Sequence, residues 1–220
     1  MHHQARSITT SQHEPHEKLG ALVEKYQNTP FKRPISEHTR EAFECVVEWL
    51  SQRQGPIILD SCCGVGESTA KIAEAFPDAC VVGLDKSAAR LEKHTHYGSQ
   101  QGNYKVIRAD VNDFWRLAKN AGWKLERHFL LYPNPYPKPA QVQKRWYASP
   151  AMPDLVALGG ILHVRSNWQL YLQEFALALQ IYAKSARLMS VPDDQLITTP
   201  FERKYLASGQ DCWQLVCDQL

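Results

Sequence analysis

The sequence predicts an α/β protein built on a doubly wound, mostly parallel seven-stranded sheet with an antiparallel C-terminal strand. From residue 57 onward, short apolar runs alternate with helix-length segments. This alternation is typical of parallel sheets with right-handed crossovers. The chain has 220 residues, 44% of them hydrophobic, which is enough for one sizeable core but not for two. We therefore expect one domain over residues 31–220, preceded by a flexible N-terminal tail over residues 1–30.

The residues before the first strand are expected to add one helix to the domain. Residues 1–30 are polar with little periodicity, which favours a mobile tail or a short helix around residues 19–26, and no core element is expected there. Ser36 is expected to cap the helix that follows. Apolar residues between Ala42 and Leu50 recur with helical spacing until Gly55 and Pro56 end the pattern.

The remaining elements follow from apolar runs bounded by turn residues. Strands are predicted at residues 57–59, 80–84, 104–109, 129–132, 161–164, 188–191 and 212–217. Helices are predicted between them at residues 67–76, 87–97, 111–121, 142–158 and 168–184. The pair Gly159-Gly160 separates the fourth of these helices from the fifth strand. The last two strands form a C-terminal pair.

Composition excludes several classes of protein. Lys plus Arg is 25 and Asp plus Glu is 23, so the net charge of +2 gives no global drive to bind nucleic acid or membrane, and any basic surface must be local. No apolar run reaches the roughly 18 residues of a spanning helix, so we expect a cytoplasmic protein with no membrane partner. The six cysteines form no C-x-x-C pair, so we expect reduced thiols and no metal site.

The first predicted strand runs into a glycine-containing loop, D-S-C-C-G-V-G-E at residues 60–67. Gly64 and Gly66 allow the backbone to turn sharply and to approach a ligand before a helix begins. No third glycine completes the G-x-G-x-x-G dinucleotide fingerprint. No Lys-Ser or Lys-Thr completes a phosphate-binding P-loop. The loop by itself therefore indicates a nucleotide-type ligand without identifying it.

Carboxylates stand at the ends of the next two strands. Asp85 comes about 20 residues after the glycines, where doubly wound folds place an acid that accepts hydrogen bonds from the ribose hydroxyls. Asp110 directly precedes the helix predicted to begin at Val111, and alone it would be interpreted as a helix cap. Together with Asp60 and the glycines, these acids are typical of the adenosyl pocket of a class I methyltransferase.

Four prolines follow the fourth strand, in Y-P-N-P-Y-P-K-P at residues 132–139. Proline fixes φ and lacks an N–H donor, so this segment can be neither a helix nor a central strand. A rigid loop is predicted at the carboxyl edge of the sheet, where open α/β sheets bind ligands. A proline-stiffened turn without a ligand is the alternative interpretation.

In their order and spacing, these motifs resemble those of the bacterial tRNA (guanine-N7)-methyltransferases. Residues 134–138 read N-P-Y-P-K where that family has D-P-W-P-K, and a basic stretch follows. Residues 166–171 read S-N-W-Q-L-Y where the family has T-D-x-x-x-Y, and residues 199–202, T-P-F-E, match T-x-F/Y-E. The resemblance covers residues 34–220 and is specific through the combination of motifs.

The resemblance implies a Rossmann-like class I methyltransferase fold that uses S-adenosyl-L-methionine to form N7-methylguanosine in tRNA, with position 46 as the target. The cofactor-binding residues that it implies are Asp60, Cys62, Gly64, Gly66, Asp85, Lys86, Asp110, Val111 and Asn134. Asn134 is also the implied catalytic residue. The implied substrate-binding residues are Lys138, Asn167, Tyr171, Thr199 and Glu202.

Asn134 and Asn167 stand where the family has aspartates, and Cys62 stands where it has a glycine. Guanine N7 has an available lone pair, so its methylation needs no general base, only in-line placement and stabilisation of the cationic product. Asn can hydrogen-bond a base edge but cannot offset positive charge as a carboxylate does. The departures leave two alternatives open: a methyltransferase acting on an exocyclic amine, as N-P-P-Y loops do, or a catalytically silent cofactor- or RNA-binding subunit.

A local basic segment is the candidate surface for tRNA. Residues 127–153 contain four Lys or Arg, interleaved aromatic residues, and, between Arg127 and Pro153, no Asp or Glu. Such segments contact phosphates and stack on unpaired bases. Lys144 and Arg145 are the predicted contacts to the RNA backbone, with an ordinary solvated helix face as the alternative. We expect a monomer or a homodimer.

Overall fold

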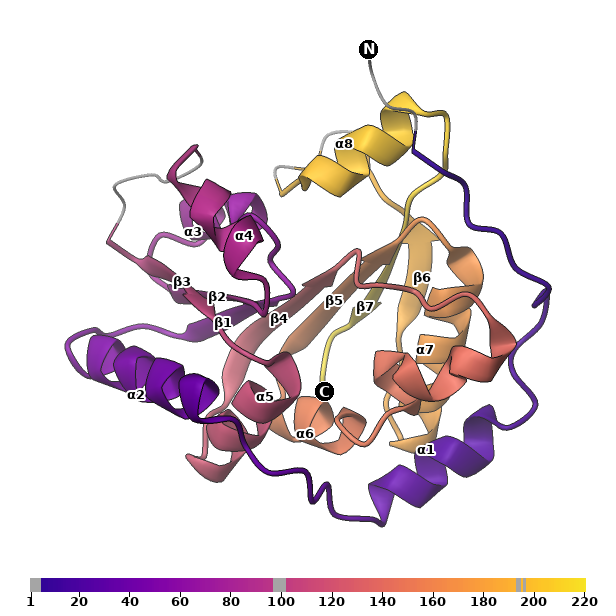
Figure 1. Cartoon of the computed structure of the whole chain (residues 1–220), viewed down its shortest axis with the longest axis horizontal. Coiled ribbons are helices and arrows are strands. Elements are labelled where there is room, and N and C mark those ends of the chain that lie inside the picture. The colour runs from indigo at the N-terminus through magenta and orange to yellow at the C-terminus, as the bar shows by residue number, and fades with distance from the viewer. Residues whose placement is uncertain (1–4, 97–101, 193–194, 196) are drawn as a thin grey trace.

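A computed structural model describes residues 5–96, 102–192, 195 and 197–220, and its described part contains one seven-stranded sheet (Figure 1). The strands are β1 (Ile57–Ser61), β2 (Cys80–Asp85), β3 (Tyr104–Arg108), β4 (Leu125–Leu131), β5 (Ile161–Ser166), β6 (Arg187–Ser190) and β7 (Trp213–Cys217). Their order is β3-β2-β1-β4-β5-β7-β6, with β1 to β5 parallel and β7 antiparallel to both of its neighbours. The predicted fold class is confirmed.

Helices surround this sheet. They are α1 (Leu19–Gln27), α2 (Glu37–Ser51), α3 (Glu67–Ala75), α4 (Ala88–Leu91), α5 (Val111–Asn120), α6 (Met152–Leu158), α7 (Gln169–Ile181) and α8 (Pro200–Ala207). The described residues also form three 3-10 helices, which are η1 (Glu92–His96), η2 (Pro139–Lys144) and η3 (Trp146–Ala148). In the described part of the chain, none of the helices has the length and apolar character needed to cross a bilayer.

Two predicted helices differ from the observed elements. The segment at 142–158 is η2, η3 and α6 instead of one helix, because Arg145 adopts extended backbone angles (φ −76°, ψ 138°) and prolines recur nearby. The helix predicted at 87–97 is the short α4 followed by η1, and Tyr97 lies outside the described residues. Helix α8, which the sequence did not predict, begins at Pro200. Thr199 caps it, since its hydroxyl accepts a hydrogen bond from the backbone N–H of Glu202.

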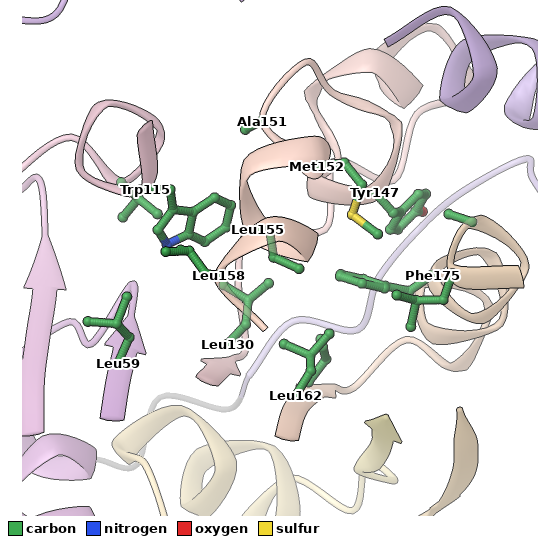
Figure 2. Packing of buried hydrophobic residues seen from close by; sticks show 14 of the residues in the cluster. Leu59, Trp115, Leu130, Tyr147, Ala151, Met152, Leu155, Leu158, Leu162 and Phe175 are labelled. Atoms are coloured by element: carbon green, nitrogen blue, oxygen red, sulfur yellow. The ribbon is translucent and has the colours of Figure 1, made fainter. Parts of the chain in front are cut away.

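The core lies on both faces of the sheet because side chains alternate along each strand. Among the described residues, two apolar clusters form, one on each face. Leu59 and Leu130 point to the larger cluster, which also contains side chains of α1, α2, α5, α6 and α7. Ile58 and Phe129 point to the opposite face, where they pack on α3. Figure 2 shows the larger cluster, with Trp115 among strand and α6 side chains.

The N-terminal residues take part in this core. The helix expected around residues 19–26 is confirmed as α1, but the expectation that no core element lies there is wrong. Leu19 and Val23 stand four residues apart on one helix face and are 4% and 1% exposed in the larger cluster. Where the tail ends and the domain begins stays a prediction.

Candidate functional site

A cavity of about 580 Å³ opens at the carboxyl edge of the sheet. Its walls come from the loops that follow β1, β2, β3 and β4, from the segment before α2, and from α8. The strand order changes direction between β1 and β4, and ligands of open α/β sheets bind at such switch points. Polar residues of the wall include Asp85, Lys86, Asp110, Asn134 and Lys144.

The glycine loop has the left-handed backbone that its sequence predicts, at Gly64 (φ 64°) and Gly66 (φ 78°). The amide of Gly64 donates to the carboxylate of Asp85 (3.0 Å). Gly66 serves packing, since a Cβ there would lie 2.4 Å from the ring of His94. Cys62 also has positive φ (66°) and lines the cavity. Burial raises the pKa of its thiol to about 12, which favours the protonated form.

Asp60 lies beneath this loop and is 1% exposed. Its Oδ2 accepts hydrogen bonds from the hydroxyls of Ser68 (2.6 Å) and Thr69 (2.7 Å), which joins β1 to α3. Its Oδ1 is buried with no hydrogen-bond partner among the described residues. Burial raises the pKa of Asp60 to about 6, against the lowering effect of the two hydroxyls.

Asp85 presents a buried carboxylate to the cavity at the end of β2. Its Oδ1 accepts from the backbone N–H of Ser87 (2.8 Å), and Arg90 approaches Oδ2 at 3.5 Å. Together with the bond from Gly64, these contacts fix the carboxylate in place. Oδ1 takes one of these bonds and keeps a second acceptor position, so Asp85 can accept a hydrogen bond from a ligand.

Asp110 both caps a helix and lines the cavity. Its Oδ1 accepts from the backbone N–H groups of Asn112 (3.0 Å) and Asp113 (3.3 Å) at the start of α5. Arg33 donates to the same oxygen at 2.8 Å. Burial acts to raise the pKa of Asp110, but the hydrogen bonds from Arg33 and Asn112 and the charge of Arg33 bring it below its usual value.

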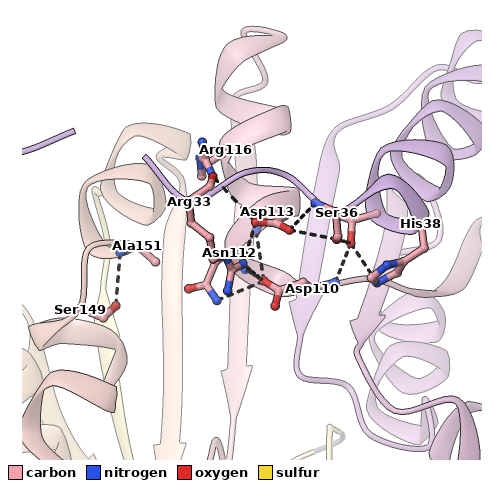
Figure 3. Close-up of polar contacts among 10 residues, drawn as sticks. Arg33, Ser36, His38, Asp110, Asn112, Asp113, Arg116, Ser149 and Ala151 are labelled. Atoms are coloured by element: carbon pink, nitrogen blue, oxygen red, sulfur yellow. Dashed lines mark hydrogen bonds and ion pairs between the residues drawn. The ribbon is translucent and has the colours of Figure 1, made fainter. Parts of the chain in front are cut away.

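The segment before α2 crosses the site and is tied to α5 (Figure 3). Arg33 bridges Asp110 and Asp113, and Ser36 donates from its backbone N–H and its hydroxyl to Asp113. Ser36 holds the N-cap position as predicted, but its hydroxyl contacts side chains instead of the helix amides. Phe31, in the same segment, lines the cavity.

The proline loop, residues 132–138, forms the facing wall. Tyr132 and Tyr136 have positive φ (51° and 46°), which is costly for residues with a Cβ. Between them Asn134 is exposed at the cavity. Its Oδ1 accepts from the backbone N–H of Tyr136 (3.2 Å), so its Nδ2 remains to donate to a ligand.

Glu202 and Thr199 support this wall from behind. Glu202 is fully buried, where its carboxylate accepts from the hydroxyl of Tyr132 (2.6 Å) and from Arg165 (3.2 Å). Thr199 caps α8 and lines a second, smaller cavity of about 220 Å³ beside the glycine loop. The structure therefore gives these residues a supporting position, and a direct substrate contact stays a prediction.

Two predicted contacts are wrong. Arg145 cannot bind the RNA backbone, because it is fully buried and paired with the equally buried Glu174. Tyr171 cannot line a substrate site, because it is fully buried against the rings of Tyr147 and Phe175. The local run of basic and aromatic residues carries no information about which of its members face inward.

Only some of the other predicted site residues lie at the cavity. Cys62, Asp85, Lys86, Asp110, Val111, Asn134 and Lys144 share the cavity wall. Asn167 instead donates to the side chain of Gln210 (2.9 Å), and Lys138 is exposed outside the residues that line the cavity.

Sequence reasoning missed three aromatic or basic wall residues, Phe31, Arg90 and Tyr205. Trp146 was among the aromatic residues of the basic segment and Phe201 stood in the T-P-F-E motif, but neither was assigned to the site. Phe201 is 41% exposed, and its ring stacks on Tyr205 with centroids 6.5 Å apart. The signal available for Phe201 was the capped helix start Thr199-Pro200, with Glu202 three residues after the cap. Phe31 lies in an aperiodic segment and gives no such signal.

Comparison with known proteins adds a family and several relatives. The model of a family described as "Putative methyltransferase" matches residues 54–215. A tRNA (guanine-N(7)-)-methyltransferase of Pseudomonas aeruginosa (strain UCBPP-PA14) is 26% identical over 180 residues, which covers 76% of this chain and 72% of that protein. A protein of the same name from Actinobacillus pleuropneumoniae serotype 5b (strain L20) is 26% identical over 202 residues, covering 86% and 74%.

Solved structures share the fold. A 16S rRNA methyltransferase, KamB, superposes with a TM-score of 0.60 at 17% identity, covering 86% of this chain and 97% of that chain. An antibiotic-related methyltransferase superposes with a TM-score of 0.57 at 12% identity over the same shares. At these identities the likeness concerns the arrangement of strands and helices alone.

Proposed function

The chain belongs to this methyltransferase family, and we propose that it transfers the methyl group of S-adenosylmethionine to N7 of a guanine in tRNA. The observation that carries the proposal is that one cavity joins Asp85 on the cofactor side to Asn134 on the proline loop. The names of the curated relatives support guanine N7 in tRNA as the acceptor.

The residues present fit S-adenosylmethionine. Asp85 offers a fixed acceptor oxygen, Oδ1, for a ribose hydroxyl. Phe31 and Val111 give the wall an apolar part suited to an adenine ring. The orphaned Oδ1 of Asp60 is a buried acceptor close beneath the glycine loop. When bound, the cofactor would supply an electrophilic methyl group on a sulfonium.

The acceptor side needs groups that orient a base. N7 of guanine is itself the nucleophile, so no general base is required. Asn134 has its Nδ2 available, and guanine carries an acceptor oxygen, O6, beside N7. Tyr136 and Phe201 present aromatic rings on which an unstacked base can lie. In the proposed function, these residues orient the base for in-line attack on the methyl group.

Cations at the rim suit the RNA backbone. Lys86, Arg90 and Lys144 all line the cavity. Lys144 is exposed and lies over the ring of Tyr136 at 5.8 Å. Guanidinium and ammonium groups at such positions bind phosphates without reading sequence.

The test is nucleoside mass analysis of tRNA from cells that lack N7-methylguanosine, after incubation with the protein and S-adenosylmethionine. We expect N7-methylguanosine as the product. Asp85→Ala should weaken cofactor binding by about 1.5 kcal/mol or more, since bonds to a charged acceptor contribute roughly 1.5–3 kcal/mol each. Methylation of an exocyclic amine, or cofactor and tRNA binding without any product, would overturn the assignment in favour of one of the two alternatives.

A further inference from the structure

We propose that the N-terminal segment, residues 5–16, is a positioning element of the site that acts through the proline loop. Together with the buried side chain of Arg145, it holds the loop in the conformation that presents Asn134 to the cavity. The consequence for methyl transfer rests on the proposed function, whereas the effect on the loop does not.

Three successive carbonyl groups of the loop are bound from behind. The carbonyl of Tyr136 accepts from Nε of Arg145 (3.1 Å). The carbonyl of Pro137 accepts from the hydroxyl of Thr10 (2.6 Å). The carbonyl of Lys138 accepts from Nη2 of Arg145 (3.4 Å). Thr10 and Arg145, which lie far apart from each other in the sequence, thus bind adjacent carbonyls of the same loop.

Arg145 is itself fixed by the N-terminal segment. Its guanidinium pairs with Glu174 (2.5 Å), and both side chains are 0% exposed. Gln12 closes the arrangement, because its Oε1 accepts from Arg145 (2.9 Å) and its Nε2 donates to Glu174 (2.9 Å). The backbone N–H of His16 also donates to Glu174 (2.7 Å). A buried ion pair needs such additional bonds to be well ordered.

The loop has little means of holding itself. Its prolines have no N–H groups to donate, so few hydrogen bonds can form within the loop. The carbonyl of Lys138 also accepts from the backbone N–H of Gln141 (2.9 Å). Tyr136 has a backbone conformation that persists only where its surroundings impose it. At the other end, the hydroxyl of Tyr132 donates to Glu202, and its backbone N–H donates to the carbonyl of Arg165 (2.9 Å).

The segment is also tied at its start. The backbone N–H of Ala5 donates to Ser208 (2.9 Å), and the carbonyl of Ala5 accepts from Gln210 (2.9 Å). From Ala5, beside the C-terminal end of α8, the chain passes along the outside of the molecule to α1 (Figure 1). Thr10 therefore meets the loop from a segment that is anchored on both sides.

The hydrogen bonds that hold the proline loop are different from those that hold the cofactor side of the cavity. Asp85 and the glycine loop make their contacts with the loops after β1 and β2 and with α3 and α4, and the hydrogen bonds of Asp85 do not involve Thr10 or Gln12. Loosening the segment should therefore lower the rate of transfer while leaving cofactor affinity unchanged. A displacement of about 1 Å in a site can cost on the order of a hundredfold in rate.

The experiment compares Thr10→Val with Thr9→Val and Thr10→Ser. Thr10→Val removes the hydroxyl that binds Pro137, Thr9→Val makes the same change at an exposed neighbour, and Thr10→Ser keeps the hydroxyl. The readouts are hydrogen exchange of the Tyr136 and Gln141 amides, which donate to Asn134 and to the carbonyl of Lys138, kcat and KM with tRNA, and calorimetric affinity for S-adenosylmethionine.

We expect Thr10→Val to raise exchange at both amides and to lower kcat by roughly tenfold, within the range that small displacements produce. Cofactor affinity should be unchanged. The melting temperature should fall by no more than about 2–4 °C, since the hydroxyl also accepts from the backbone N–H of Gln12 and a lost hydrogen bond costs little stability. The other two variants should behave as wild type. Unchanged exchange in Thr10→Val, or equal losses in Thr9→Val, would overturn the proposal. If wild type forms no N7-methylguanosine, the proposed function fails, and the exchange comparison alone decides whether the segment positions the loop.

Discussion

At the residue scale, the charge at position 134 bears directly on the chemistry. Asn134 stands where the tRNA (guanine-N7)-methyltransferases that the chain resembles have an aspartate, and its Oδ1 already accepts from the N–H of Tyr136. An aspartate could keep that bond and add a negative charge near the incipient cationic base. Such a charge stabilises the transition state more than the ground state.

Asn134→Asp is therefore expected to preserve or raise turnover on guanine N7. Asn134→Ala is expected to lower turnover by roughly ten- to a hundredfold, because losing one polar contact costs about 1.5–3 kcal/mol. Single-turnover kinetics with nucleoside identification measure both. If neither substitution altered rate or product, the proline loop would be scaffold, and Asn134 would lose its role.

A second residue, Asp60, should make folding stability depend on pH. Its folded pKa of about 6 lies above its ordinary value of 3.8. Between these values the folded state binds more protons than the unfolded state, so stability falls as pH rises from about 4 to about 6 and is level above that range. The two pKa values correspond to a change on the order of 3 kcal/mol, since one pH unit corresponds to about 1.4 kcal/mol.

Asp60→Asn should flatten this part of the profile, because the amide does not titrate. Urea unfolding of wild type and variant at several pH values between about 4 and 7 measures the difference. Asp78→Asn, at an exposed position, is the matched control. A variant profile parallel to that of wild type would mean that Asp60 is not the titrating group.

At the scale of elements, η2 carries the basic surface that remains once Arg145 is assigned to the interior. Lys144, at its end, is exposed at the cavity rim. Lys144→Ala should weaken tRNA binding and reduce the slope of log affinity against log salt by about 0.7 to 0.9 for one lost phosphate contact. Lys124→Ala is the control, because Lys124 precedes β4 at the opposite edge of the sheet. Equal slopes for all three proteins would make Lys144 part of an ordinary solvated surface.

Strand ends were the part of the site that sequence could predict. Asp85 and Asp110 each follow an apolar run and precede a helix, so their place at the carboxyl edge follows from topology. Arg145 looked like its neighbour Lys144, because its burial depends on Glu174, 29 residues away, and on Gln12, 133 residues away. Local sequence does not encode such long-range pairs.

At the scale of the whole molecule, the site is assembled from segments that lie far apart in the chain. Four strand-end loops, the segment before α2 and helix α8 all reach one cavity. The sheet order could be predicted, since strands alternating with helices allow few topologies. The path of residues 5–36 over the sheet edge could not, because contacts such as Arg33 with Asp110 leave no periodic pattern in the sequence.

The central claim is that guanine N7 receives the methyl group, and replacing that one atom tests it most directly. A tRNA transcript made with 7-deazaguanosine lacks the N7 lone pair but keeps its phosphates. We predict that labelled S-adenosylmethionine transfers methyl to the guanosine transcript and not to the 7-deazaguanosine transcript, which should still compete for binding. Methylation of both transcripts at the same rate would contradict the account, because the acceptor would then be another atom.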